Sequence, residues 1–217
     1  MSAKLKVAVL ISGRGSNLQA LIDACAAPNF PAQIVLVMSN VENAQGLERA
    51  RAAGIPTEII AHAGYDRRQT FDAAMDVSLT KAGVELICLA GFMRILGDDF
   101  VRKWQGRLIN IHPSLLPAFK GIHVHEQAID AGVKISGCTV HYVISELDSG
   151  PAIAQAAVAV RDDDTPESLA KRVLEAEHRL YPSALKLIAE GRARLDNGRV
   201  VFHDCPFTDG LLQNPTG

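Results

Sequence analysis

The residue types best suited to chemistry stand in the short segment Arg107–Pro117, where an amide and an imidazole are two positions apart. Residues i and i+2 of a strand point to the same face, so Asn110 and His112 are expected to emerge side by side as the chain leaves a sheet. An amide can donate hydrogen bonds to a forming oxyanion, and an imidazole can carry a proton near neutral pH. A strand end whose polar groups cap the next turn is the alternative, and this segment alone leaves both open.

A second candidate site is the glycine-containing segment Ile11–Gln19, which follows an apolar run and precedes a helical pattern. Glycines permit tight turns and close approach of a ligand, and free amides at a helix N-terminus favour an anion such as a phosphate. Ser16 and Gln19 also have the spacing of a capping box. A dinucleotide site is disfavoured, because Leu18 replaces the third glycine of Gly-x-Gly-x-x-Gly and Ser39, rather than an acid, ends the second apolar run. A sugar-phosphate or mononucleotide site is the preferred interpretation, with a purely structural turn as the alternative.

An acid in the tight turn Leu147–Pro151 is the third candidate. Asp148 either caps this turn or faces His112 across a site, where a carboxylate would favour the imidazolium and fix the ring.

The apolar segment Leu89–Leu96 carries one cation, Arg94, and follows another apolar run. Ligands of open parallel sheets bind beyond the carboxyl ends of the strands. This segment would suit a flat aromatic ligand with a carboxylate for the arginine, and ordinary core packing is the alternative.

Other classes of site have weaker signals. His123, His125 and His141 invite a metal hypothesis, but they lack an obvious carboxylate or cysteine partner, so no metal is expected. The chain has no Gly-x-Ser-x-Gly segment, which disfavours a serine hydrolase.

Composition narrows the functional class further. The 217 residues are 48% hydrophobic and carry a net charge of −2, which suits an α/β domain and makes nucleic acid an unexpected partner. No segment approaches the ~20 apolar residues that span a bilayer, and the N-terminus lacks a signal-peptide cleavage region. Four scattered cysteines indicate reduced thiols, so a cytoplasmic protein is expected.

These residues must be positioned by alternating strands and helices. Near-continuous apolar runs predict buried strands at Val7–Ile11, Ile34–Met38, Thr57–Ile60, Leu86–Ala90 and Leu108–Ile111. Helical spacing predicts helices at Ser16–Ala26, Ala44–Ala53 and Asp66–Ala82. This order is typical of an α/β, Rossmann-like, mostly parallel twisted sheet with helices on both faces.

The later part of the chain has a different pattern. Strands are predicted at Thr139–Ile144 and Ala152–Val160, too close for a crossover helix and therefore an antiparallel pair. A long helix over Glu167–Ala189 follows, with Thr165, Pro166 and Ser168 as its start signal and Gly191 as its stop. A single domain over 1–203 is predicted, with a loosely held tail over 204–217.

Four of these segments together resemble the phosphoribosylglycinamide formyltransferase family, folate-dependent enzymes of purine synthesis. The resemblance covers roughly Lys4–Arg194 and rests on Leu10–Ala20, Leu89–Leu96, Asn110–Pro117 and Glu146–Pro151. The Asn-x-His-Pro-Ser-Leu-Leu-Pro segment is specific to the wider formyltransferase family, and the Ser-Gly-x-Gly-Ser-Asn loop narrows the match. Lys120 departs from the pattern, since many relatives have proline there.

The resemblance implies transfer of a formyl group from the co-substrate 10-formyltetrahydrofolate to the amine of glycinamide ribonucleotide, without a metal. It assigns catalysis to Asn110, His112 and Asp148, which would stabilise a tetrahedral oxyanion and move a proton. It places the ribonucleotide on Gly15, Ser16, Asn17 and Glu177. It places the folate on Arg68, Met93, Arg94, Ile95, Leu96 and Asn110, closed over by Ile144, Ser145, Glu146, Leu147 and Asp148. The expected partners are small molecules, and a monomer or homodimer is expected.

Three rivals are kept. A methionyl-tRNA formyltransferase shares the catalytic segment but needs a second, RNA-binding domain and a basic charge. A 10-formyltetrahydrofolate hydrolase carries a regulatory domain before the first strand, which here starts within the first ten residues. A non-catalytic sugar-phosphate binder would bind ligand without turnover.

Overall fold

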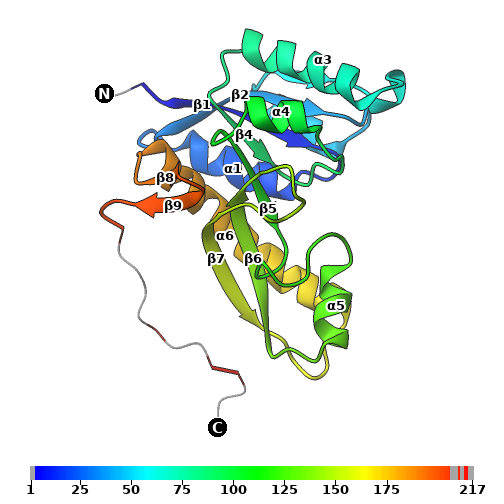
Figure 1. Cartoon of the computed structure of the whole chain (residues 1–217), viewed down its shortest axis with the longest axis vertical. Helices are drawn as coiled ribbons and strands as arrows, with labels where there is room; N and C mark the ends of the chain where they lie inside the picture. Colours follow the sequence, from blue (N-terminus) through cyan, green and yellow to red (C-terminus); the bar gives the residue numbers. More distant parts are fainter. Residues whose placement is uncertain (1–2, 206–209, 211–212, 215–217) are drawn as a thin grey trace.

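The computed structural model describes residues 3–205, 210 and 213–214, and a seven-stranded sheet forms its centre in the order β3-β2-β1-β4-β5-β6-β7 (Figure 1). The first five strands pair in parallel, whereas β6 pairs antiparallel with both β5 and β7. The expected Rossmann-like sheet with an antiparallel late pair is therefore confirmed. The strands are β1 Leu5–Ile11, β2 Ala32–Ser39, β3 Thr57–Ile59, β4 Leu86–Leu89, β5 Leu108–His112, β6 Ile135–Tyr142 and β7 Ala152–Ala159.

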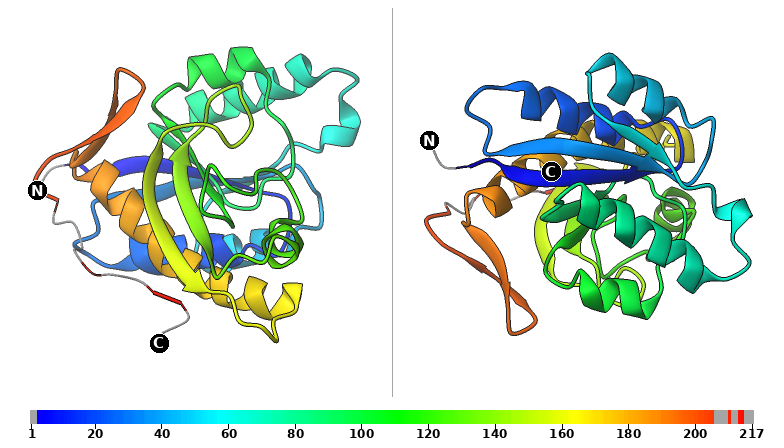
Figure 2. Two further views of the ribbon diagram at one scale, coloured as in Figure 1. Left: turned by 60° about the horizontal axis from the view of Figure 1, so that its bottom comes forward. Right: turned by 90° about the horizontal axis from the view of Figure 1, so that it is seen from above.

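Helices cover both faces of this sheet (Figure 2). Apolar side chains of α1, α2 and α6 pack on one face, and those of α3 and α4 pack on the other. Strand β1 serves both cores, because Val7 and Val9 face the first and Ala8 and Leu10 the second, as the period of two requires. The helices are α1 Ser16–Ala26, α2 Gln45–Ala52, α3 Arg68–Lys81, α4 Asp98–Lys103, α5 Val124–Asp130 and α6 Pro166–Ala189, with a 3₁₀ turn at His62–Gly64.

The long helix α6 begins and ends where the sequence signals predict. The Thr165 hydroxyl accepts from the Ser168 amide and the Ser168 hydroxyl accepts from the Thr165 amide, which completes a capping box, and Pro166 is the first helical residue. Gly191, just beyond the last turn, has a φ of 70°, a left-handed conformation typical of a helix stop.

Strand β6 differs from its expected bounds, beginning at Ile135 and ending at Tyr142 rather than spanning Thr139–Ile144. Its first half is dominated by small residues that carry no alternating apolar signal. Gly137 is one of them, and a Cβ there would lie 2.0 Å from the Ala156 carbonyl oxygen of β7. Close packing against β7 therefore selects small residues in this half, which hides the strand from a hydrophobicity pattern.

A second, two-stranded sheet was not expected. Strands β8 (Ala193–Asp196) and β9 (Arg199–Phe202) form a hairpin whose two central residues, Asn197 and Gly198, both have positive φ. An Asn-Gly pair is a strong hairpin signal, so the sequence did contain the information. Of the tail expected over 204–217, positions 206–209, 211–212 and 215–217 lie outside the described residues. Among the helices that the structure describes, none combines the length and apolarity that crossing a bilayer needs.

The strand order places a switch point between β1 and β4. Strand β1 is followed by helix α1 on one face, and β4 leads to α4 on the other. The loops that leave the two carboxyl ends are joined there, since Ser12 N–H donates to the Gly91 carbonyl at 3.1 Å. This is the position at which open α/β sheets bind ligands.

Candidate active site

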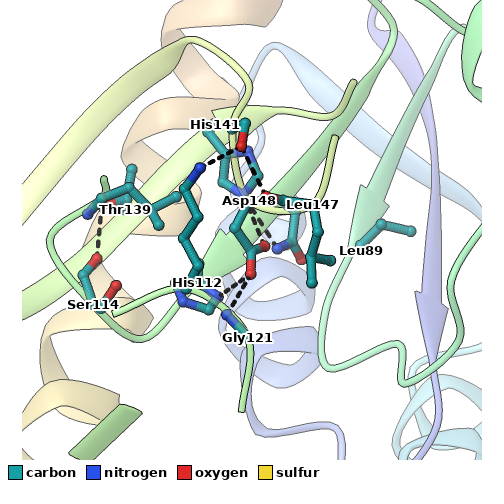
Figure 3. Close-up of polar contacts among 12 residues, drawn as sticks. Leu89, His112, Ser114, Gly121, Thr139, His141, Leu147 and Asp148 are labelled. Carbon is teal, nitrogen blue, oxygen red and sulfur yellow. Dashed lines mark hydrogen bonds and ion pairs between the residues drawn. The ribbon is translucent and has the colours of Figure 1, made fainter. Parts of the chain in front are cut away.

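The imidazole and the distant acid predicted from the sequence do converge (Figure 3). His112 Nδ1 lies 3.5 Å from Asp148 Oδ2, and both side chains are buried, with exposures of 6% and 8%. His112 Nε2 lies 3.0 Å from the Phe119 carbonyl oxygen. Both neighbours accept hydrogen bonds, so the ring can satisfy both only as the imidazolium.

Asp148 is placed by a loop, residues 143–151, whose ends meet. Tyr142 N–H donates to the Pro151 carbonyl at 3.0 Å. A Cβ at Gly150 would lie 1.7 Å from the Tyr142 carbonyl oxygen, so only glycine fits this close approach. Asp148 has a φ of 48°, a left-handed conformation that aspartate tolerates better than most residues. The carboxylate is thus aimed inward by the loop, and its Oδ2 also accepts from Gly121 N–H at 2.9 Å.

The amide of Asn110 meets a histidine that the sequence interpretation had weighed only as a metal ligand. Asn110 lies opposite His141 in the β5–β6 register, and Asn110 Nδ2 is 3.3 Å from His141 Nε2. His141 Nδ1 donates to the Tyr142 carbonyl at 2.9 Å, so Nε2 is left to accept from the amide. Burial lowers the pKa of His141, which favours this neutral form. Asn110 therefore has a fixed orientation and a second N–H free to donate.

His141 also lies near the acid, with Nε2 3.9 Å from Asp148 Oδ1. It lies in the same cluster as His112 and Asp148 (Figure 3), and its contact with Asn110 Nδ2 adds that amide to the cluster. The signal that could have identified it is its alternation with Thr139 on a strand antiparallel to β5.

The turn that follows His112 is held by the neighbouring strand, β6. Thr139, opposite His112 on β6, donates from Oγ1 to the Ser114 carbonyl at 2.7 Å and accepts from Leu116 N–H at 3.0 Å. The Ser114 hydroxyl then donates to the Ala118 carbonyl at 2.6 Å. The turn after the catalytic segment is thereby fastened to the sheet.

The glycine loop opens helix α1 with free amides. Gly15 has a φ of 70° and precedes the first helical residue, Ser16, and no side chain caps this end. The expected capping box is therefore wrong, because Ser16 lies inside the helix and Gln19 bonds instead to Asp23. Uncapped amides at a helix N-terminus suit an anion, as the sequence interpretation proposed.

Two predicted ribonucleotide contacts meet although they are far apart in the sequence. Asn17 Nδ2 on α1 donates to Glu177 Oε2 on α6 at 2.7 Å, and Glu177 is only 5% exposed. Burial raises the pKa of Glu177, and the bond from Asn17 lowers it. Asn17 Oδ1 is buried and has no hydrogen-bond partner in the structure. This oxygen can therefore accept a hydrogen bond from a ligand.

The predicted folate contacts border the cluster on two sides. Met93 and Ile95 are 76% and 59% exposed, whereas Arg94 is half-buried and Leu96 is buried. Their segment leaves β4 at Leu89, which pairs with Asn110 of the catalytic strand. On the other side the loop presents exposed Ser145, Glu146 and Leu147 and half-buried Ile144. Arg68 is exposed at the start of α3, near Gly97.

The remaining histidines of the metal hypothesis differ in position: burial, and less strongly the nearby His112, lower the pKa of half-buried His125. His123 pairs with Glu126 at 2.8 Å, and its side chain is 68% exposed. Across residues 3–205, 210 and 213–214, no group of three or more His, Cys, Asp or Glu side chains has a geometry that could hold a metal ion.

Taken together, the geometry joins hydrogen-bond donors, a histidine between two acceptors, and an open helix N-terminus at one edge of the sheet. Donors in fixed positions stabilise charge that develops on an oxygen, and a histidine can transfer a proton to or from a reacting group. This arrangement suits acyl or formyl transfer to a phosphorylated acceptor.

Comparison with known proteins points the same way. The formyl transferase family model matches residues 5–185. A trifunctional purine biosynthetic protein adenosine-3 from Bos taurus is 54% identical over 200 residues, which cover 92% of this chain and 20% of the relative. The chain thus spans about a fifth of the length of that curated relative.

Relatives of similar length also match. Phosphoribosylglycinamide formyltransferase of Escherichia coli (strain K12) is 44% identical over 213 residues, which cover 98% of each chain. The crystal structure of glycinamide ribonucleotide transformylase 1 from Symbiobacterium toebii superposes with a TM-score of 0.91 at 46% identity, covering 94% of this chain and 96% of that chain.

Proposed function

Because the chain belongs to the formyl transferase family, we propose that it transfers a formyl group from 10-formyltetrahydrofolate to the amine of glycinamide ribonucleotide, a step of purine (IMP) synthesis. The observation that carries the proposal is the convergence of Asn110, His112 and Asp148 at the same edge of the sheet as the open N-terminus of α1. One end of this arrangement suits a phosphate, and the other suits an oxyanion.

In the proposed reaction the substrate amine attacks the formyl carbon and a C–N bond forms. The carbonyl electron pair moves to oxygen, which becomes an oxyanion facing Asn110 Nδ2 and His112, whose Nε2–H turns to it from the Phe119 carbonyl that it meets in the structure. Loss of one such donor typically costs about 3–4 kcal/mol of transition-state stabilisation. Asp148 orients the His112 ring, since its carboxylate faces Nδ1.

The intermediate then collapses by breaking the bond between the formyl carbon and N10 of the folate. The proton lost from the attacking amine must reach N10, and His112 or a water held by Asp148 relays it. Positioned proton transfer of this kind contributes about 10²–10⁴ in rate. The products are the formylated ribonucleotide and tetrahydrofolate, so atoms and charge balance.

The two substrates have separate binding regions in this proposal. Gly15, Ser16 and Asn17 bind the phosphate with backbone and amide donors, and Glu177 accepts from the ribose hydroxyls. The folate lies against Met93, Arg94, Ile95 and Leu96 with Arg68 nearby, and the loop from Ile144 to Asp148 closes over its pterin. No metal takes part.

The wider setting is proposed on the same basis. A single formyltransferase domain over 1–203 carries out the reaction in the cytoplasm with small-molecule substrates, as a monomer or homodimer, without nucleic acid or membrane. A hydrolase would use the same cluster on water, and a silent binder would use only the phosphate end.

One assay distinguishes these functions. Purified protein is mixed with 10-formyltetrahydrofolate and glycinamide ribonucleotide, the folate absorbance is followed, and the formylated product is identified by its mass. We expect turnover that requires the ribonucleotide. Turnover without it would indicate a hydrolase, and binding without turnover would indicate a silent binder.

A variant pair tests the catalytic assignment. His112→Ala should abolish transfer in a protein whose circular dichroism is unchanged, whereas His123→Ala, at an exposed histidine, should retain it. Normal turnover by a well-folded His112→Ala protein would exclude the proposed role.

A further inference from the structure

The segment 91–97, which carries the proposed folate contacts Met93 to Leu96, has no helix or strand structure of its own. Such a segment gets its shape from contacts with its neighbours rather than from a repeating backbone pattern. The residues that hold it therefore control the surface that the folate would meet, although they need not touch the folate.

Side chains hold the segment near both ends. Met93 N–H donates to Ser12 Oγ at 2.8 Å, which ties the segment to the glycine loop. Gly97 N–H donates to Asp72 Oδ2 at 2.8 Å, which ties it to helix α3. Asp72 is 6% exposed, so this second bond is well shielded from water.

Helix α3 also holds the middle of the segment. The guanidinium carbon of Arg94 lies 5.1 Å from the ring centroid of Phe71, which adjoins Asp72. Burial raises the pKa of Asp72, and the Gly97 amide, Arg68 and Arg94 lower it in that order, so both arginines attract its carboxylate. Asp72 Oδ1 and Arg94 Nε are buried without a hydrogen-bond partner in the structure. The attraction between the two groups is thus one of charge.

The fit at Gly97 is close. A Cβ added there would lie 2.7 Å from Asp72 Oδ2, shorter than carbon–oxygen contacts in proteins. Glycine at this position allows the carboxylate to approach the backbone, so the contact depends on both residues.

We propose that Asp72 is a positioning residue for the folate: it holds the backbone of segment 91–97 through Gly97 and attracts Arg94, so that Met93 to Leu96 keep the shape the pterin requires. Met93 and Ile95 are thereby turned outward, and Arg94 and Leu96 inward. The inference rests on the proposed function, because it needs this segment to be the folate surface.

The test compares two aspartates on the same helix. Asp76 lies one turn after Asp72 and also joins α3 to α4, accepting from Trp104 Nε1 at 3.0 Å and from Lys103. Neither of these bonds involves segment 91–97, so Asp76→Ala is a matched control for loosened packing of α3.

We expect Asp72→Ala to raise KM for 10-formyltetrahydrofolate about tenfold or more, the usual effect of losing a hydrogen bond to a charged group. KM for glycinamide ribonucleotide should stay within about twofold, because that site shares no partner with Asp72. Asp72→Asn keeps an acceptor for Gly97 N–H but not the charge, so it should recover part of the loss. Asp76→Ala should leave both KM values near those of the unsubstituted protein.

A second variant covers the case in which Asp72→Ala does not fold. Gly97→Ala displaces the carboxylate without removing it and should also raise the folate KM selectively. The inference is overturned if both variants keep the original folate KM, or if Asp76→Ala raises it as much as they do.

Binding of tetrahydrofolate, measured by anaerobic calorimetry, separates this inference from the proposed function. If the unsubstituted protein is inactive but binds tetrahydrofolate, the proposed transfer fails and the variants still test Asp72 through their Kd. If it transfers formyl groups and the Asp72 variants bind normally, only the inference about Asp72 fails. If it does not bind tetrahydrofolate, both fail.

Discussion

The two ends of the candidate site are built from different parts of the protein. The phosphate end is formed mainly by backbone from one contiguous segment, where Gly15 opens α1 with free amides. The reaction end is formed by side chains from β5, β6 and the loop 143–151. A backbone-built end requires glycines that leave room, whereas a side-chain-built end requires strand register and loop closure.

The two ends also depend on different neighbouring residues for their shape. Gly15 packs against Gly46, where an added Cβ would lie 2.6 Å from the Gly46 Cα. Asp148 depends instead on Gly150 and Tyr142, which close the loop and aim its carboxylate at His112. We therefore expect substitutions at the reaction end to change kcat, and substitutions at the phosphate end to change KM for the ribonucleotide.

Among the substitutions that test this comparison, the largest effect is expected at Asp148. Asp148→Asn keeps a residue that tolerates the left-handed backbone, with its φ of 48°, and removes only the charge that faces His112. We expect kcat to fall about 10²–10³-fold, as for the loss of other transition-state contacts, with little change in the melting temperature. Steady-state kinetics and calorimetry measure both. A kcat within a factor of a few of the original would mean that the carboxylate is not part of the reaction end.

An intermediate effect is expected at Gly15. Gly15→Ala places a Cβ at a φ of 70° and against Gly46, which costs about 1–2 kcal/mol in backbone strain. KM for glycinamide ribonucleotide should rise about tenfold, as for a lost hydrogen bond to a charged group, with a smaller change in the folate KM. Gly54→Ala is the matched control, since Gly54 has a φ of 69° with nothing within 4 Å of an added Cβ. Equal rises in both KM values for Gly15→Ala would remove the distinction between the two ends.

The smallest effect is a pH dependence at Glu177. Burial raises the pKa of this carboxyl above its usual range, so it is protonated on mild acidification, before an exposed glutamate would be. The neutral form accepts poorly from ribose hydroxyls, so KM for the ribonucleotide should rise a fewfold as the pH falls, and Glu177→Gln should remove that dependence. A KM profile identical in the two proteins would contradict the assignment.

The same shift has a consequence for stability. A carboxyl whose folded-state pKa lies above its unfolded value binds more protons in the folded state, so its charged form costs stability that acidification restores. Glu177→Gln should therefore raise the melting temperature at neutral pH while it weakens ribonucleotide binding. This result would show that the Glu177 carboxylate lowers folding stability but is needed for binding, which supports a ligand-binding role for the phosphate end.

Prediction from the sequence was best where the signal was local. Ser16–Ala26 has the predicted bounds, and the start of α6 follows from Thr165, Pro166 and Ser168. It failed where packing selected the residues, as in the first half of β6, where Gly137 and its small neighbours lie against β7. The hairpin at Asn197 and Gly198 was missed although its turn residues are typical.

His141 is the clearest residue that the sequence alone did not assign. Its role beside Asn110 depends on the antiparallel register of β5 and β6, which pairs residues 31 positions apart. A list of histidines cannot show that pairing, because register is set by the turn geometry and by which faces are buried.

By itself, the sequence determined the alternation of strands and helices, the open glycine loop and the chemical types at Asn110, His112 and Asp148, because these depend on local conformation and on residue identity. Only the tertiary structure decided which side chains meet: Asp148 with His112, Asn17 with Glu177, and Asp72 with Gly97. Each of these contacts joins residues far apart in the chain, and their meeting depends on sheet order, register and loop closure, which are properties of the packed molecule as a whole.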